Sequence, residues 1–232
     1  MQEGLGFLWL LSLIASAAAW LYREVVLAGK KGIASRSQMA GCELARKILD
    51  TCHLTHTAVQ PAPSRGPEPA PHRDELLLNE KIYSNSSLAA LAETLHETVH
   101  WIESSKVFLS TRPGGMGGRF FSGWVLLSWT CLALGVLFSH WVWLFRLGQF
   151  LFVLAFLAAL ASLAGEWEIG QRAVSQLTAL ERLGTDERVR MKEVLKALRW
   201  TPLAEIFRIP IQTLFRLRLK WKRETNQMRA PL

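Results

Sequence analysis

Cysteine is scarce in this sequence, and the few cysteines form no recognisable framework. Cys42, Cys52 and Cys131 cannot all pair with one another, and Cys131 lies within a long apolar block. The chain therefore lacks the disulfide network of small secreted domains, and we expect free thiols facing a reducing compartment. Cys52, His53 and His56 form a cluster that could bind a metal ion, but it lacks the two cysteine pairs of a structural zinc site, so we expect a loop there.

Charged side chains are missing from three long apolar blocks, which cover residues 5–22, 120–138 and 147–165. At about 1.5 Å per residue, each block is just long enough to span the hydrocarbon core of a bilayer. The sequence therefore predicts a mainly helical membrane protein with about three transmembrane helices. Because no ionisable group lies inside the blocks, we expect no active site within the membrane.

Acidic residues are outnumbered by basic ones, with 19 Asp and Glu against 27 Lys and Arg, and the net charge is +8. Most basic residues flank the apolar blocks, where they set topology and contact anionic lipid, so we expect no nucleic-acid partner. No positive residue precedes the first block, which argues against a cleaved signal peptide despite the small residues at 15–19. We expect an uncleaved first span with its N-terminus outside, which places both large basic segments inside.

These patterns divide the chain into four parts. Residues 1–22 are predicted to form the first transmembrane helix, and residues 120–165 a transmembrane hairpin of the second and third helices. A loop domain, residues 23–119, lies between them. A helical C-terminal segment, residues 166–232, follows the hairpin and ends in a basic amphipathic tail, which we expect to lie on the inner membrane surface.

The loop domain contains signals for helices, a loop and a small β-element. Helical periodicity covers residues 39–49 and 87–102, and a short strand is predicted around Leu76–Leu78. Residues 61–71 contain five prolines and are predicted to form an exposed loop. The glycine-rich residues 112–119 lack the spacing of a phosphate-binding loop, so we expect a flexible link into the membrane.

The second predicted helix of the loop domain carries an H-E-x-x-H motif, made by His96, Glu97 and His100. Residues four apart on a helix lie on the same face, so both imidazoles can point at one metal ion. Glu97 lies one position further round the helix, within reach of a water on that metal. This arrangement is typical of zinc peptidases, in which the glutamate is the general base.

A catalytic zinc usually has a third protein ligand, and the sequence offers several. The candidates in the loop domain are His53, His56 and His72. His140 lies on the wrong side of the membrane in the expected topology. A carboxylate at the inner end of the third span, Glu166 or Glu168, can meet the histidines at the same membrane surface, and position alone favours Glu166 only weakly.

Three motifs follow one another in a fixed order: Ala-Arg-Lys-Ile-Leu at 45–49, H-E-x-x-H at 96–100 and Glu-Trp-Glu-Ile-Gly-Gln-Arg-Ala at 166–173. With the two apolar spans before the last motif, this order resembles the bacterial membrane-bound neutral zinc metallopeptidases called YugP-like. The resemblance extends from about residue 5 to residue 200. Val99 stands where that family usually has glycine, and Trp167, Glu168 and Gly170 also depart from its pattern.

The resemblance implies a membrane-bound zinc metallopeptidase of the zincin-like (gluzincin) type. His96, His100 and Glu166 would then be the zinc ligands, and Glu97 the catalytic base. The implied location is the bacterial inner membrane, and the expected topology puts the soluble parts and the active site on its cytoplasmic side. The expected partners are a peptide or membrane-protein substrate and the lipid bilayer, and the oligomeric state stays open.

Supporting roles can be assigned by residue type alone. Glu168 is a candidate for orienting a histidine, and Tyr83 for donating a hydrogen bond to the oxyanion. The edge of the strand around Leu76–Leu78 is a candidate for binding substrate by strand addition.

Two other functions fit parts of the pattern. A catalytically inactive, zinc-binding membrane scaffold would keep the metal-binding positions, and Val99 could crowd a site built around glycine. A di-iron protein is suggested because Glu93-x-x-His96 and Glu97-x-x-His100 both have E-x-x-H spacing. Di-iron bundles need these motifs on two facing helices, however, and here both lie on one.

Overall fold

Three long helices dominate the computed structural model, which describes residues 2–62, 75–104, 116–138, 140–179 and 183–228. They are α1 (Gln2–Lys31), α5 (Met116–Leu137) and α6 (Val142–Ala179). Each is long and apolar enough to cross a membrane, and most of each apolar surface faces outward. The predicted mainly helical protein with three candidate spans is therefore confirmed.

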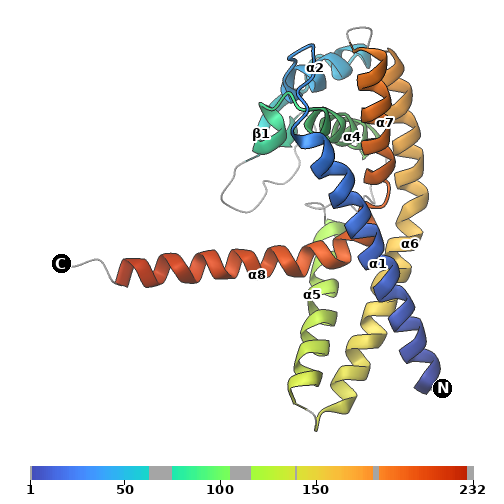
Figure 1. Ribbon diagram of the computed structural model, residues 1–232, viewed down its shortest axis with the longest axis vertical. Coiled ribbons are helices and arrows are strands. Elements are labelled where there is room, and N and C mark those ends of the chain that lie inside the picture. The colour runs from blue at the N-terminus through green and yellow to red at the C-terminus, as the bar shows by residue number, and fades with distance from the viewer. Residues whose placement is uncertain (1, 63–74, 105–115, 139, 180–182, 229–232) are drawn as a thin grey trace.

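The helix α6 is much longer than a bilayer requires. Its 38 residues correspond to about 57 Å, roughly twice the ~30 Å of a hydrocarbon core. Figure 1 shows α5 and α6 as a hairpin whose tip lies at one end of the molecule, while the far half of α6 rises into a compact group of helices at the other end. Because α6 is unbroken at residue 165, it crosses the predicted boundary between hairpin and C-terminal segment, and this division stays a prediction.

The compact group contains most of the described residues of the loop domain, up to residue 104, together with one C-terminal helix. Its helices are α2 (Gly41–Thr51), α3 (Glu80–Tyr83), α4 (Leu88–Ser104) and α7 (Thr185–Leu198). Two short strands, β1 (Ala58–Ala62) and β2 (Glu75–Asn79), pair in parallel, with Ala58 opposite Glu75 and Ala62 opposite Asn79. The predicted small β-element is therefore present.

Two expectations for the loop domain need correction. Pro61 was expected in a loop but lies in β1, whose residues are mostly exposed, as suits a proline on an edge strand. The glycine-rich stretch was expected to be a flexible link, yet α5 already begins at Met116. The rest of the proline-rich stretch, residues 63–71, and the start of the glycine-rich stretch lie outside the described residues.

The far half of α6 is part of the core of the compact group. Ala173 and Leu177 of α6 are fully buried against α4, which lies between α2, α6 and α7. This packing explains why α4 is apolar over so much of its surface. The core has the following buried members: Leu27, Met39, Leu44, Ile48, Leu88, Ala89, Leu91, Ala92, Leu95, Val99, Ala173, Leu177, Leu183, Met191, Val194, Leu195 and Leu198.

The last helix, α8 (Thr201–Met228), runs in a different direction from the others. Its first residues pack into the bundle of spans, where Leu203 and Ile206 are buried with Val125 of α5 and Phe152 of α6. Figure 1 shows the remainder of α8 leaving the bundle across the direction of α5 and α6. Pro202 lies in its first turn, where a backbone N–H has no partner within the helix.

Candidate metal centre

The two histidines of the H-E-x-x-H motif lie one turn apart on α4 and point to the same side. Their ring centroids are 4.9 Å apart, and the rings are nearly perpendicular. The side chain of His96 is 6% exposed and that of His100 is 16% exposed. The helical spacing predicted this shared face, and the burial shows that both imidazoles face the protein interior.

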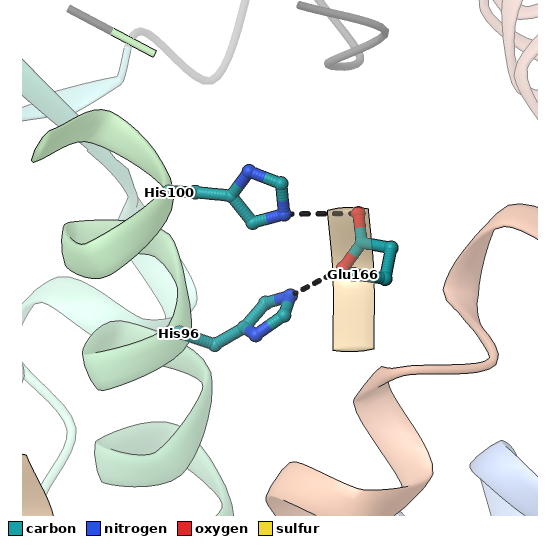
Figure 2. Close-up of side chains that lie close together, drawn as sticks. All are labelled: His96, His100 and Glu166. Carbon is teal, nitrogen blue, oxygen red and sulfur yellow. Dashed lines mark hydrogen bonds and ion pairs between the residues drawn. The ribbon is translucent and has the colours of Figure 1, made fainter. Parts of the chain in front are cut away.

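Glu166 of α6 completes the cluster from a distant part of the chain. Its Oε1 lies 2.9 Å from Nε2 of His100, and its Oε2 lies 3.3 Å from Nε2 of His96. Figure 2 shows both imidazoles projecting from α4 toward this one carboxylate. Within the described part of the chain, two buried atoms of the cluster have no hydrogen-bond partner: Oε2 of Glu166 and Nδ1 of His96. The cluster therefore brings together buried polar atoms that are not fully satisfied by one another.

The length of α6 is what carries Glu166 to the histidines. Beyond the apolar part of α6, Ile169, Ala173 and Leu177 recur on the face that packs into the core with α4. Glu166 precedes them at helical spacing, so it lies on the same side of α6. A second polar contact joins the two helices further along, where Arg172 forms an ion pair with Glu103 of α4.

Sequence reasoning did not identify the contact between Glu103 and Arg172. A signal was present on α4 alone, because Glu103 follows His100 by three residues and so lies near it on the helix, whereas Arg172 follows Glu166 by six residues, about 9 Å further along α6. Arg172 also contacts Glu168 one turn away on α6, with 2.6 Å between Nη2 and Oε1. The arginine therefore links α4 to α6 beside the cluster.

Other carboxylates lie near the histidines on α4. Glu97 follows His96 directly and is half-buried. Glu93 lies one turn before Glu97, and burial raises the pKa of Glu93, although the charges of Arg23 and Lys31 oppose the shift and the charge of Glu97 adds to it. The surroundings of this part of α4 therefore disfavour additional negative charge.

The remaining sequence candidates lie elsewhere. His53 and His56 occupy the turn between α2 and β1, and neither belongs to the cluster. His140 is exposed at the tip of the α5–α6 hairpin, at the opposite end of the molecule in Figure 1. His72 lies outside the described residues.

The candidates for supporting roles are placed as follows. Glu168 is exposed and paired with Arg172. Tyr83 packs against a separate apolar cluster that includes Leu76 and Trp101. Their expected roles stay predictions. Val99 is 3% exposed and packs in the core, so its side chain fills space within the fold.

The arrangement of His96, His100 and Glu166 suits a small divalent metal ion. One possible ligand atom from each of the three residues lies within 4.8 Å of the other two. Among the described residues, this is the cluster of His, Cys, Asp or Glu side chains that could hold a metal ion. Zinc at about 2.0–2.1 Å from tetrahedral ligands needs those ligands about 3.3 Å apart. The separations of 2.9 and 3.3 Å between nitrogen and oxygen are close to this requirement. Two imidazoles and one carboxylate are also a known ligand set of catalytic zinc.

A comparison with protein-family models matches residues 6–219 of this chain to the family described as "Putative neutral zinc metallopeptidase". A search of curated proteins and a search of solved structures each returned no match.

Proposed function

The chain belongs to the "putative neutral zinc metallopeptidase" family, and from this premise we propose that it is a membrane-bound peptidase that hydrolyses peptide bonds with a zinc ion held by His96, His100 and Glu166. The observation that carries the proposal is the convergence of these three side chains, because Glu166 lies 66 residues from His100 in the sequence. Helical spacing alone brings two histidines together by chance in unrelated proteins. A buried carboxylate from another helix at the same point is what a three-ligand site requires.

Each residue of the cluster has a specific task in this proposal. His96 and His100 would hold the metal through Nε2, the nitrogens that face Glu166, with their protons on Nδ1. Glu166 supplies a negatively charged oxygen and fixes the position of α6 relative to α4. When bound, zinc would lower the pKa of a coordinated water toward about 7 and polarise the substrate carbonyl.

Glu97 acts as the general base. Glu97 directly follows His96 on α4 and is not one of the three residues of the cluster, which supports a role beside the metal and not as a ligand. The carboxylate accepts a proton from the attacking water and delivers that proton to the leaving amine as the peptide bond breaks.

The proposed location is the bacterial inner membrane, with the compact group on the cytoplasmic side. The three candidate spans support a membrane location. The cytoplasmic orientation rests on the basic residues that flank the spans on the side of the compact group. The proposed substrates are peptides or segments of membrane proteins that reach the cluster at the end of the spans.

The decisive experiment measures metal content in detergent-purified protein. Wild type is compared with Glu166→Ala and with Glu168→Ala, which serves as the control because it removes the exposed carboxylate two residues away that the sequence left as the alternative third ligand. We expect about one zinc per chain in wild type and in the control, and a loss of zinc in Glu166→Ala.

Other results would reject parts of the proposal. Absence of zinc from wild type after purification in zinc-containing buffer would remove the metal site. Full zinc content in Glu166→Ala would reject Glu166 as the third ligand. Zinc in wild type without cleavage of any peptide in a diverse library would favour the inactive scaffold.

A further inference from the structure

The outer part of α8, residues 211–228, carries large apolar side chains that the rest of the protein does not cover. Leu214, Leu217 and Trp221 are 68%, 58% and 73% exposed, whereas Leu203 and Ile206 near the start of the helix are buried. Exposed apolar groups on this scale mark a surface that contacts something else. The feature is separate from the metal cluster and does not depend on the proposed peptidase activity.

The start of α8 is fixed firmly to the spans. Nε1 of Trp129 on α5 donates a hydrogen bond to the carbonyl of Ile206, with 3.0 Å between the atoms. The ring of Phe207 stacks on Trp20 of α1 at 6.5 Å and meets the edge of Trp129 at 5.3 Å. These contacts determine the direction in which the outer part leaves the bundle.

That direction follows the plane of a membrane crossed by α5 and α6. Figure 1 shows α8 running across the spans below the compact group, at the level of the end of α5 that is nearest that group. Near the start of α8, Nε of Arg23 on α1 donates a hydrogen bond to Oγ1 of Thr201 at 3.3 Å. The buried guanidinium of Arg23 therefore lies at the same height along the spans as the start of α8. A helix placed here would lie at the boundary between lipid and water.

The sequence of the outer part is amphipathic. Leu214, Leu217 and Trp221 follow one another at intervals of three and four residues, which places them along one stripe of the helix. The same segment is strongly basic, with Arg216, Arg218, Lys220, Lys222 and Arg223 interspersed among its apolar residues. Between residues 211 and 228 there are five basic residues and one acidic residue, Glu224.

The charge pattern indicates what contacts the exposed apolar stripe. Five basic residues in one segment are incompatible with a fourth span through the hydrocarbon core. An apolar stripe bordered by basic residues matches an anionic lipid surface, in which the rings and leucines enter the interface and the cations contact headgroups. We propose that the outer part of α8 is an in-plane membrane helix that binds anionic lipid headgroups at the end of the spans.

The test uses the full chain in lipid nanodiscs, with one spin label per protein. Native cysteines at 42, 52 and 131 are first replaced by serine or alanine. Labels at Leu214→Cys, Leu217→Cys and Trp221→Cys are compared with labels at Gln212→Cys and Lys220→Cys, and accessibility to oxygen and to a water-soluble nickel chelate is measured. We expect the three stripe positions to favour oxygen at one similar shallow depth, and the two others to favour nickel.

Lipid composition provides the second readout. In phosphatidylcholine discs without anionic lipid, or at high salt, we expect the lipid-facing fraction of the label at 217 to fall relative to phosphatidylglycerol discs. The double variant Arg216→Gln, Lys220→Gln should lower the ratio of bound to free helix by roughly 25-fold, about five-fold for each charge. Its matched control is Arg190→Gln, Lys196→Gln, which removes two exposed basic residues of α7 and should leave the ratio unchanged.

Three results would overturn the proposal. Nickel accessibility at every position would place the outer part of α8 in water. A steady increase in depth from 212 to 221 would make it a fourth span. Dipolar broadening between labels on different chains, unaffected by lipid charge, would assign the stripe to a second copy of the protein.

Discussion

Nε2 of His100 on α4 lies 2.9 Å from Oε1 of Glu166 on α6, although 66 residues separate them in the sequence. Two spans of the candidate membrane hairpin lie between these residues along the chain. The contact forms because α6 continues without a break from the apolar hairpin into the core around α4. The candidate membrane hairpin is thereby joined to the H-E-x-x-H helix through one polar cluster.

Zinc is expected to stabilise the folded protein, because its proposed ligands come from two helices. A ligand that binds only the native state adds about 2.7 kcal/mol at 100 times its dissociation constant. Wild-type protein stripped with a chelator should therefore unfold at a lower temperature in detergent and recover when zinc returns. Glu166→Ala should lack this recovery, and Glu168→Ala should retain it. An equal zinc response in all three proteins would mean that the stabilising ion binds elsewhere.

Glu97→Gln should separate metal binding from catalysis. The substitution preserves the size of the side chain but removes its ability to accept a proton. We expect zinc content to stay at the wild-type level and peptide turnover to fall by about 10²–10⁴-fold. The measurement pairs elemental analysis with the rate on a peptide that the wild type cleaves. Unchanged turnover would reject Glu97 as the base.

The sequence predicted the local parts of the candidate site better than its long-range part. His96 and His100 share a face because of helical spacing, which is a property of four consecutive peptide units. The pairing with Glu166 depends on how α6 packs against α4, and spacing carries no information about that. Position at the end of a span favoured Glu166 over Glu168 only weakly, and the resemblance to a known family named the residue.

Other features escaped prediction for similar reasons. The strand β1 contains Pro61, and a proline-rich stretch is a poor predictor of a strand that survives only because it lies at an edge. The ion pair between Glu103 and Arg172 joins two surfaces whose proximity is a consequence of the fold. The three candidate spans were predictable because long uncharged apolar runs have few alternatives to a membrane.

Close packing around Gly41 leads to a prediction about stability. A Cβ at this position would lie 2.7 Å from Oγ1 of Thr94 and would also collide with the carbonyl oxygen of Ile82. Gly41→Ala should therefore force α2 away from α4 and cost about 1–3 kcal/mol, seen as a lower unfolding temperature. Gly29→Ala on α1 is the matched control, because nothing lies within 4 Å of its Cβ position, and alanine there should be neutral or stabilising by up to about 1 kcal/mol. Equal stability of the two variants would contradict the packing.

The carboxylate of Glu187 connects α7 to the segment after α1 and makes stability depend on pH. Burial alone would raise the pKa of Glu187, but backbone N–H groups of Arg36 and Gly184 donate to it at 2.6 and 3.0 Å and hold the pKa below its ordinary value. A carboxyl group with a lowered pKa in the folded state stabilises the protein above its unfolded pKa, and that stabilisation is lost as pH falls through the folded pKa.

Glu187→Gln should therefore be less stable than wild type by about 1–2 kcal/mol at pH 7, the scale of a helix cap. The difference should shrink below about pH 4.3, the pKa of a free glutamate, and disappear at still lower pH. Unfolding temperatures of both proteins between pH 3 and 7, in a detergent without ionisable groups, measure this convergence. Curves that stay parallel over the whole range would show that the hydrogen bonds to Arg36 and Gly184 do not depend on the charge of Glu187.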